Sequence, residues 1–101
     1  MKKILFLSIL LFSLGIGFAQ TSISGKVSNE NAEELIGVNI SVPSISGLGV
    51  ITGIDGSYTL VLTEGCKDIR FQYIGYKDHI ENICLEQNET QILNIVLQED
   101  S

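Results

Sequence analysis

The stretch "GVITGIDGSYTL", residues 49–60, has the pattern of two short strands joined by a tight turn. Residues 50–52 form a short, mostly apolar run, and residues 57–62 alternate between polar and apolar side chains, which is the period of a strand. Between them Asp55 precedes Gly56, a pair that favours a hairpin because glycine adopts positive φ without a steric clash. The sequence therefore predicts a β-hairpin with its turn at Asp55 and Gly56.

The alternative for Asp55 is a metal ligand, because acidic loops with glycines can cradle a cation. A calcium ion takes about six to eight oxygen ligands, usually from several carboxylates a few residues apart. The nearest other acidic residues are Glu34 and Glu64, both far along the chain. Because too few carboxylates lie near Asp55 to coordinate a calcium ion, the hairpin turn is the favoured interpretation. We expect Asp55 to cap backbone N–H groups, and we predict no metal and no cofactor.

Alternation of polar and apolar residues extends outward from this hairpin in both directions. Pro43 lacks a backbone donor, so a strand before it either ends there or lies at a sheet edge. Residues 63–68 are expected to form a turn. Short strands with frequent turn signals, and no helical period after residue 20, predict an all-β fold: a seven-stranded antiparallel β-sandwich. The predicted strands are residues 21–28, 38–42, 50–52, 57–62, 69–73, 77–83 and 91–97.

The same alternation predicts which side chains form the core, because successive residues of a strand point to opposite faces of the sheet. The residues expected on the inner faces are Ile23, Gly25, Val27, Val38, Ile40, Val42, Tyr58, Leu60, Leu62, Ile69, Phe71, Tyr73, Leu93, Ile95 and Leu97.

The first twenty residues, "MKKILFLSILLFSLGIGFAQ", have the three-part pattern of a secretory signal peptide. Two lysines precede an apolar run over residues 4–19, and small residues stand at Gly17 and Ala19. The apolar run is shorter than the roughly 20 residues of a membrane-spanning helix. We expect cleavage after Ala19 or Gln20 and export of the protein, with one domain over residues 21–98 and a tail or start of a linker at 99–101.

The net charge of the mature chain disfavours some classes of binding partner. Removing Lys2 and Lys3 leaves four basic against twelve acidic residues, a net charge of −8. An acidic surface repels phosphate backbones and anionic lipids. We therefore expect no nucleic-acid partner and no direct insertion of the mature domain into a membrane.

Two cysteines, Cys66 and Cys84, lie in a chain that is expected to leave the cytoplasm, where a pair can form a disulfide. If residues 68–74 and 76–83 pair about a bend at Gly75, the two cysteines face each other, since each is nine residues from Gly75. Closing that loop is worth about 3 kcal/mol. The alternative is two small buried thiols, and a bulge at Gly75 would also shift the register.

Catalytic residues are not evident. His79 is the only histidine, and one histidine with two separated cysteines does not supply the three or four ligands of a zinc site. A Ser–His–Asp triad is possible on composition alone, but no nucleophile elbow is present. A solvated strand histidine is the expected state of His79, and no catalytic residue is predicted.

Four segments in this order resemble the carboxypeptidase regulatory-like domain, as found at the N-terminus of TonB-dependent outer-membrane transporters for glycans and similar nutrients. They are residues 23–27 (ISGKV), 35–38 (LIGV), 52–58 (TGIDGSY) and 73–77 (YIGYK), and the resemblance spans residues 22–97. The resemblance implies a transthyretin-like sandwich and a non-catalytic folding or interaction module. The turn at residues 32–34 departs from the pattern, which more often has a glycine there, and the cysteines are not part of it.

Two functions follow from the resemblance. The first is the N-terminal periplasmic module, or an isolated or truncated relative, of a TonB-dependent outer-membrane nutrient transporter. Its expected partners are other domains of the transporter or periplasmic proteins, and its location is the periplasm or the outer membrane. The second is a free-standing secreted or periplasmic binding or adhesion module, with carbohydrate as one class of ligand. Tyr73 and Tyr76 flank the expected bend at Gly75. Either they grip a partner segment or a sugar ring, or Tyr73 belongs to the core and Tyr76 packs over the end of the sandwich.

Overall fold

The computed structural model describes residues 20–100, so the signal peptide predicted for residues 1–20 lies outside the described part except for Gln20. Within residues 20–100 the fold is all-β, and no helix is long and apolar enough to cross a membrane. Eight strands follow one another along the chain: β1 (Ser22–Asn29), β2 (Asn39–Ser41), β3 (Gly49–Ile51), β4 (Ser57–Val61), β5 (Gly65–Gln72), β6 (His79–Leu85), β7 (Thr90–Ile92) and β8 (Ile95–Leu97).

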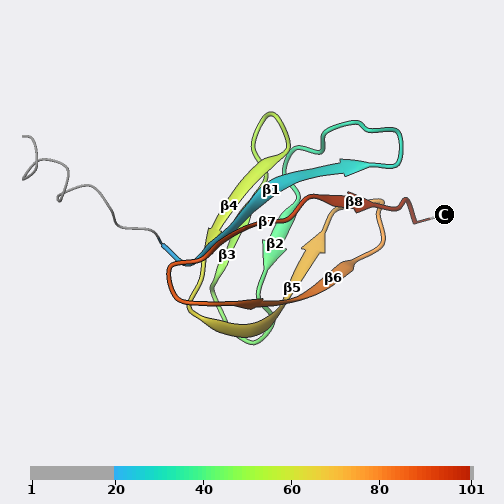
Figure 1. Cartoon of the computed structure of the whole chain (residues 1–101). Coiled ribbons are helices and arrows are strands. Elements are labelled where there is room, and N and C mark those ends of the chain that lie inside the picture. Colours follow the sequence, from blue (N-terminus) through green and yellow to red (C-terminus); the bar gives the residue numbers. More distant parts are fainter. Residues whose placement is uncertain (1–19, 101) are drawn as a thin grey trace, which may run out of the picture.

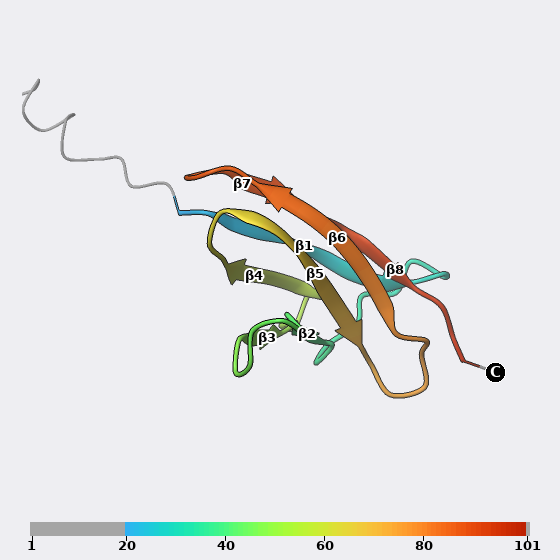
Figure 2. The same ribbon diagram turned by 90° about the horizontal axis from the view of Figure 1, so that it is seen from below.

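The strands form two sheets that enclose one core (Figures 1 and 2). In the first sheet β1 lies between β4 on one side and β7 and β8 on the other. In the second sheet the order is β3-β2-β5-β6. The prediction of a two-sheet, all-β sandwich is confirmed.

The core consists of the inward residues of both sheets, as the alternation predicts. Phe71 is the largest side chain that is fully buried, and the ring of Tyr58 meets it edge-on with centroids 5.8 Å apart. Tyr73 and Leu93 pack at the margin and are only partly buried. The fully or nearly fully buried apolar residues are Ile23, Val27, Leu35, Val38, Ile40, Val42, Tyr58, Leu60, Leu62, Ile69, Phe71, Ile83, Leu85, Ile95 and Leu97.

The predicted strand at residues 91–97 is wrong in two respects. It is divided into β7 and β8 by Leu93 and Asn94, which raises the strand count from seven to eight. Both parts run parallel to β1, so the sandwich is not wholly antiparallel. The reason is that the chain changes sheets after β6. β6 belongs to the second sheet, whereas β7 and β8 lie beside β1 in the first sheet and run in the same direction as β1.

The division of this strand reflects a crossing of backbones at Gly25. The register is the same on both sides of the break, with Ser24 opposite Ile92 and Val27 opposite Ile95. Between these pairs a Cβ added at Gly25 would lie 2.0 Å from the carbonyl oxygen of Leu93. The Leu93 carbonyl thus occupies the space that any side chain at position 25 would need.

The prediction for the turn before β5 is corrected, and of the two alternatives for the strand before Pro43 the first is confirmed. The turn expected at residues 63–68 is shorter, because β5 already begins at Gly65 and extends the hairpin with β6 to seven residue pairs. β2 ends before Pro43, but it is an inner strand, with β3 and β5 on its two sides. The edge strands of this sheet are β3, with three residues, and β6, whose Glu81 is half-buried on the inner side. A short strand and an inward charge both disfavour pairing with another chain.

The connections divide between two ends of the sandwich. Chain direction brings together the β1–β2 loop (residues 30–38), the β3–β4 turn (52–56), the β5–β6 loop (73–78) and residues 98–100 after β8. We call these four segments the loop end; it lies in the upper and right part of Figure 1, away from the blue start of the described chain.

Candidate functional site

Three of the four family-like sequence segments contribute to the loop end, and the first, residues 23–27, leads toward it along β1. The backbone N–H of Val27 donates to the carbonyl of Gly56 (2.9 Å), and the N–H of Leu35 donates to the carbonyl of Val27 (3.0 Å). The fourth segment joins through Tyr76, whose hydroxyl accepts a hydrogen bond from the side chain of Asn29 (3.3 Å). Segments that are far apart in the sequence therefore form one hydrogen-bonded unit.

Thr52 joins the β3–β4 turn to the β1–β2 loop. Its side chain is buried, donates a hydrogen bond to the carbonyl of Leu35 (2.6 Å) and accepts one from the N–H of Val38 (2.9 Å). Its backbone makes two more hydrogen bonds with Gly37 and Val38. Buried backbone groups need partners, so a hydroxyl at this position satisfies one donor and one acceptor at once.

Replacing Thr52 with valine is expected to lower the free energy of unfolding by about 2–4 kcal/mol. Valine has the same shape but leaves the Leu35 carbonyl and the Val38 N–H buried without partners, at about 1–3 kcal/mol for each. Thr52→Ser is the matched control, because it keeps the hydroxyl and loses only a methyl group. Urea denaturation of the two variants measures the difference. Equal stability of Thr52→Val and Thr52→Ser would show that the two hydrogen bonds contribute nothing.

Asp55 and Gly56 lie in the β3–β4 turn, where the sequence places a hairpin. Gly56 has φ of 74°, and a Cβ there would also approach the Val27 carbonyl oxygen to 2.8 Å. The Asp55 carboxylate accepts hydrogen bonds from the hydroxyl and the backbone N–H of Ser57. These two hydrogen bonds hold the pKa of the Asp55 carboxyl below its usual 3.8. The carboxylate caps the first residue of β4.

The lowered pKa of Asp55 predicts how the stability of the turn depends on pH. A carboxyl whose pKa is lower in the folded state stabilises the fold above its unfolded pKa, and this contribution is lost as the pH falls through the folded pKa. We expect the wild type to be more stable than Asp55→Asn at neutral pH and to lose that advantage in acid below the usual 3.8. Thermal unfolding of both proteins over this pH range measures the effect. A difference in stability that does not change with pH would contradict the capping role.

The bend expected at Gly75 is a turn in the β5–β6 loop. Gly75 has φ of 85°, the N–H of Tyr76 donates to the carbonyl of Tyr73 (3.0 Å), and the two tyrosine rings lie 5.7 Å apart. Both rings are partly buried against the core, whereas Ile74 between them is 92% exposed. The C-terminal residues run alongside, with the N–H of Asp100 donating to the carbonyl of Gly75 (3.0 Å).

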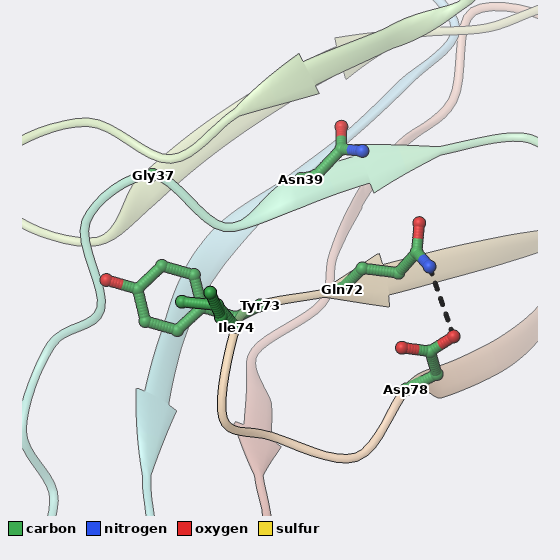
Figure 3. Close-up of a pocket in the computed structure, with 6 residues that line it drawn as sticks. All are labelled: Gly37, Asn39, Gln72, Tyr73, Ile74 and Asp78. Atoms are coloured by element: carbon green, nitrogen blue, oxygen red, sulfur yellow. Dashed lines mark hydrogen bonds between the residues drawn. The ribbon is translucent and has the colours of Figure 1, made fainter.

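Beside this turn the surface forms a shallow hollow of about 480 Å³ (Figure 3). Asn39 and Gln72 are opposite each other on β2 and β5, and their side chains project to the same side. Gln72 Nε2 donates to Asp78 Oδ2 (3.1 Å), and Asp78 is the last residue of the β5–β6 loop, directly before β6. The residues that line the hollow are Gly37, Asn39, Gln72, Tyr73, Ile74 and Asp78.

Cys66 and Cys84 lie opposite each other near the other end of the β5–β6 hairpin and are joined by a disulfide. Their Cα atoms are 3.9 Å apart, and both residues are exposed on the outer face of the sheet. Disulfides persist in oxidising compartments, so this pair is consistent with export of the protein.

His79 lies at the start of β6, far along the hairpin from the cysteines. Its Nε2 is 2.9 Å from Glu81 Oε1, and its ring packs at 6.1 Å from that of Phe71. Among residues 20–100 no group of three or more histidine, cysteine, aspartate or glutamate side chains is placed to hold a metal ion. Within the described residues His79 therefore has one carboxylate neighbour, Glu81, and no third group of this kind joins them.

Sequence reasoning missed the hollow and the role of Thr52. Asn39 and Gln72 are polar at outward positions of two predicted strands, which marks them as surface residues but does not say that they are neighbours. Thr52 is a polar residue next to an apolar run, and burial could not be inferred from the alternation. The missing information in both cases is the order of strands in the sheet.

The sequence matches the CarboxypepD_reg-like domain family over residues 23–101. The chain belongs to this family. Its members are typically non-catalytic, and three of the four family-like segments contribute to the loop end of this CarboxypepD_reg-like domain. The resemblance read from the four sequence segments is confirmed. Among curated proteins, none matches the sequence.

Solved structures share the fold at low sequence identity. A chain of a type II Cohesin-X-Dockerin complex from Acetivibrio cellulolyticus matches with a TM-score of 0.63 at 11% identity, covering 76% of this chain and 56% of that chain. The Bacillus anthracis TIE protein matches with a TM-score of 0.63 at 20% identity, covering 80% and 17%. A DUF3823 family protein from Bacteroides ovatus matches with a TM-score of 0.56 at 15% identity, covering 79% and 45%.

The domain spans only part of each of these structures, from 17% to 56% of their chains. At such low identities the similarity shows a shared β-sandwich fold. The fold occurs in these structures as one portion of a longer chain.

Proposed function

We propose that this CarboxypepD_reg-like domain is the non-catalytic N-terminal module, or an isolated relative, of a TonB-dependent outer-membrane nutrient transporter. The observation that supports the proposal is the family match over residues 23–101, which begins directly after a segment with the pattern of a signal peptide. The exposed disulfide supports an oxidising compartment. The module resides in the periplasm, at the outer membrane, and its partners are other domains of the transporter or periplasmic proteins.

The experiment is to read the gene beyond the codon of residue 101 and to follow the native product in fractionated cells with an antibody against residues 21–100. The proposal predicts a continuous reading frame into a plug and barrel, and a band in the outer-membrane fraction at the mass of a transporter. N-terminal sequencing of that band tests the expected cleavage after Ala19 or Gln20. A product found only in the soluble periplasmic fraction, at the mass of the domain alone, would overturn its place in a transporter chain and leave the isolated or free-standing module.

A second candidate is a free-standing secreted or periplasmic binding module. The hollow beside Tyr73 favours it, because amide, carboxylate and aromatic groups converge there on a surface that the described residues leave open. The fractionation experiment separates the two candidates by size and location. A titration with ligands, described next, tests the hollow itself.

A further inference from the structure

We propose that the hollow between β2, β5 and the β5–β6 loop binds a neutral saccharide. The proposal goes beyond the transporter assignment and gives the second candidate function its site and class of ligand. It rests on the chemistry of the hollow alone. If the titration shows no binding, the transporter assignment is unaffected. Conversely, the reading frame beyond residue 101 does not test whether the hollow binds a ligand.

A row of polar groups forms one side of the site. Asn39 and Gln72 are direct cross-strand partners, so their side chains stand about 5 Å apart on the same face. The hydrogen bond from Gln72 Nε2 to Asp78 Oδ2 fixes the orientation of the Gln72 amide, which leaves its other N–H and its oxygen for a ligand. Asn39 is exposed and offers the same groups. Each of the two amides carries donors and an acceptor, and a sugar hydroxyl can bind to either kind of group.

An apolar wall forms the other side. The ring of Tyr73 is packed against Tyr76 at 5.7 Å, which holds it in place, and the exposed Ile74 extends the wall outward. Gly37 completes the rim, and because it has no side chain, the space above it stays open. An apolar wall beside a polar row matches a sugar ring, which presents C–H groups on its faces and hydroxyls at its edge.

The dimensions agree with this ligand. Neighbouring strands are about 4.8 Å apart, which is close to the width of one pyranose ring, so a ring can span from Asn39 to Gln72. The volume of about 480 Å³ accommodates a short oligosaccharide. The hollow is shallow, and a ligand there keeps much of its hydration, which predicts weak binding.

Charge and pairing exclude two other classes of ligand. Among residues 20–100 the only charged side chain that lines the hollow is the carboxylate of Asp78, so phosphates and other anions are repelled. A peptide that adds as a strand needs unpaired backbone groups. β2 is paired on both sides by β3 and β5, and β5 is paired by β2 and β6, so the floor of the hollow offers side chains only.

The test is an NMR titration of residues 21–101 with a panel of neutral trisaccharides: maltotriose, cellotriose, xylotriose and mannotriose. We expect at least one of them to shift the side-chain amide signals of Asn39 and Gln72, with a dissociation constant on the order of 1 mM. If none of the four trisaccharides shifts these amide signals at concentrations up to about ten times that dissociation constant, the proposal is overturned. A short lysine-rich peptide is titrated in parallel, and shifts at the hollow with the peptide alone would overturn it in favour of a basic protein segment.

Variants on the same outer face show whether the binding is specific to the hollow. Asn39→Ala and Gln72→Ala are each expected to weaken saccharide binding about tenfold, since each removes a hydrogen bond to the ligand. Asn82→Ala is the matched control: Asn82 is also an exposed amide on this face, but it is paired with Asp68 (2.9 Å) and does not line the hollow. Equal loss of binding in all three variants, or in none, would contradict the assignment of the site.

Discussion

Replacing Gly25 with alanine is expected to lower the free energy of unfolding by more than about 3 kcal/mol, which is a large share of the stability of a small domain. The added Cβ would lie 2.0 Å from the carbonyl oxygen and 2.6 Å from the carbonyl carbon of Leu93. A collision with a flexible side chain can be relieved by a change of rotamer. Here the colliding atoms belong to the backbone of Leu93, which connects β7 to β8 beside β1, so a whole segment has to move.

The backbone at Leu93 is held on every side. Its N–H donates to the carbonyl of Ser24 (2.7 Å), and its carbonyl accepts a hydrogen bond from the hydroxyl of Tyr58 (2.6 Å). On the other side of the crossing, Asn94 Oδ1 accepts from the N–H of Lys26 (2.9 Å). Burial, and to a lesser degree the charge of Glu81, raise the pKa of the Tyr58 hydroxyl, which keeps it protonated as the donor. Displacing Leu93 breaks these hydrogen bonds together.

Urea denaturation followed by circular dichroism measures the effect, with Gly53→Ala as the matched control. A Cβ at Gly53 would find its nearest atom, the carbonyl oxygen of Ser57, at 3.9 Å, which is an ordinary contact. Tyr58→Phe covers the case in which Gly25→Ala does not fold, because it removes only the hydrogen bond to Leu93 and is expected to cost about 1–3 kcal/mol. A Gly25→Ala protein as stable as Gly53→Ala would contradict the crossing of backbones described here.

The strands themselves could be predicted because their signal is local. Inward residues such as Ile40, Leu60 and Ile69 stand at alternate positions, and each short run is bounded by turn residues. The turn at Asp55 and Gly56 is also a local signal, since the capping carboxylate and the residue with positive φ are neighbours in the sequence. In a hairpin a local turn also predicts pairs that are farther apart in the sequence. The bend at Gly75 sets the register that places Cys66 opposite Cys84.

The pairing of β1 with β7 and β8 could not be predicted, because it joins residues 68 positions apart in the chain, such as Ser24 and Ile92. Alternation says which face a residue occupies and nothing about which strand lies beside it. The crossing at Gly25, the two-sided pairing of β2 and the hollow at Asn39 and Gln72 all depend on this order of strands.

One departure from the family pattern acquires a physical meaning in the structure. Residues 32–34 lack the glycine that is expected there, and Ala32 has φ of 62°, in the left-handed region that favours glycine. The conformation is held by Asn29, whose carbonyl accepts from the N–H of Ala32 (3.0 Å) and whose side chain accepts from the N–H of Asn31 and Glu33. The hydrogen bonds of Asn29 thus stabilise at Ala32 a backbone conformation that usually requires a glycine.

Removing the disulfide is expected to cost about 3 kcal/mol of the free energy of unfolding. The bond joins residues 18 positions apart, and in the chain-entropy description a loop of that length loses about this much freedom in the unfolded state. The double variant Cys66→Ser, Cys84→Ser isolates the cross-link, because both cysteines are exposed and serine there removes almost no buried apolar surface. The native hairpin keeps its register, since six further residue pairs hold it: the five from Lys67–Ile83 to Phe71–His79, and Gly65–Leu85.

The measurement compares urea denaturation of the wild type, oxidised and reduced, with that of the double variant. If the disulfide acts through the unfolded chain, reduced wild type and double variant have the same midpoint, and both lie below the oxidised protein. The double variant in the presence of reductant is the control, and its midpoint is expected not to change. Alkylation before reduction decides whether the bond exists in solution: an unchanged mass supports it, and two alkylated thiols contradict it. A bond that forms without raising the midpoint would show that the β5–β6 hairpin already restricts the unfolded chain as much as the cross-link does.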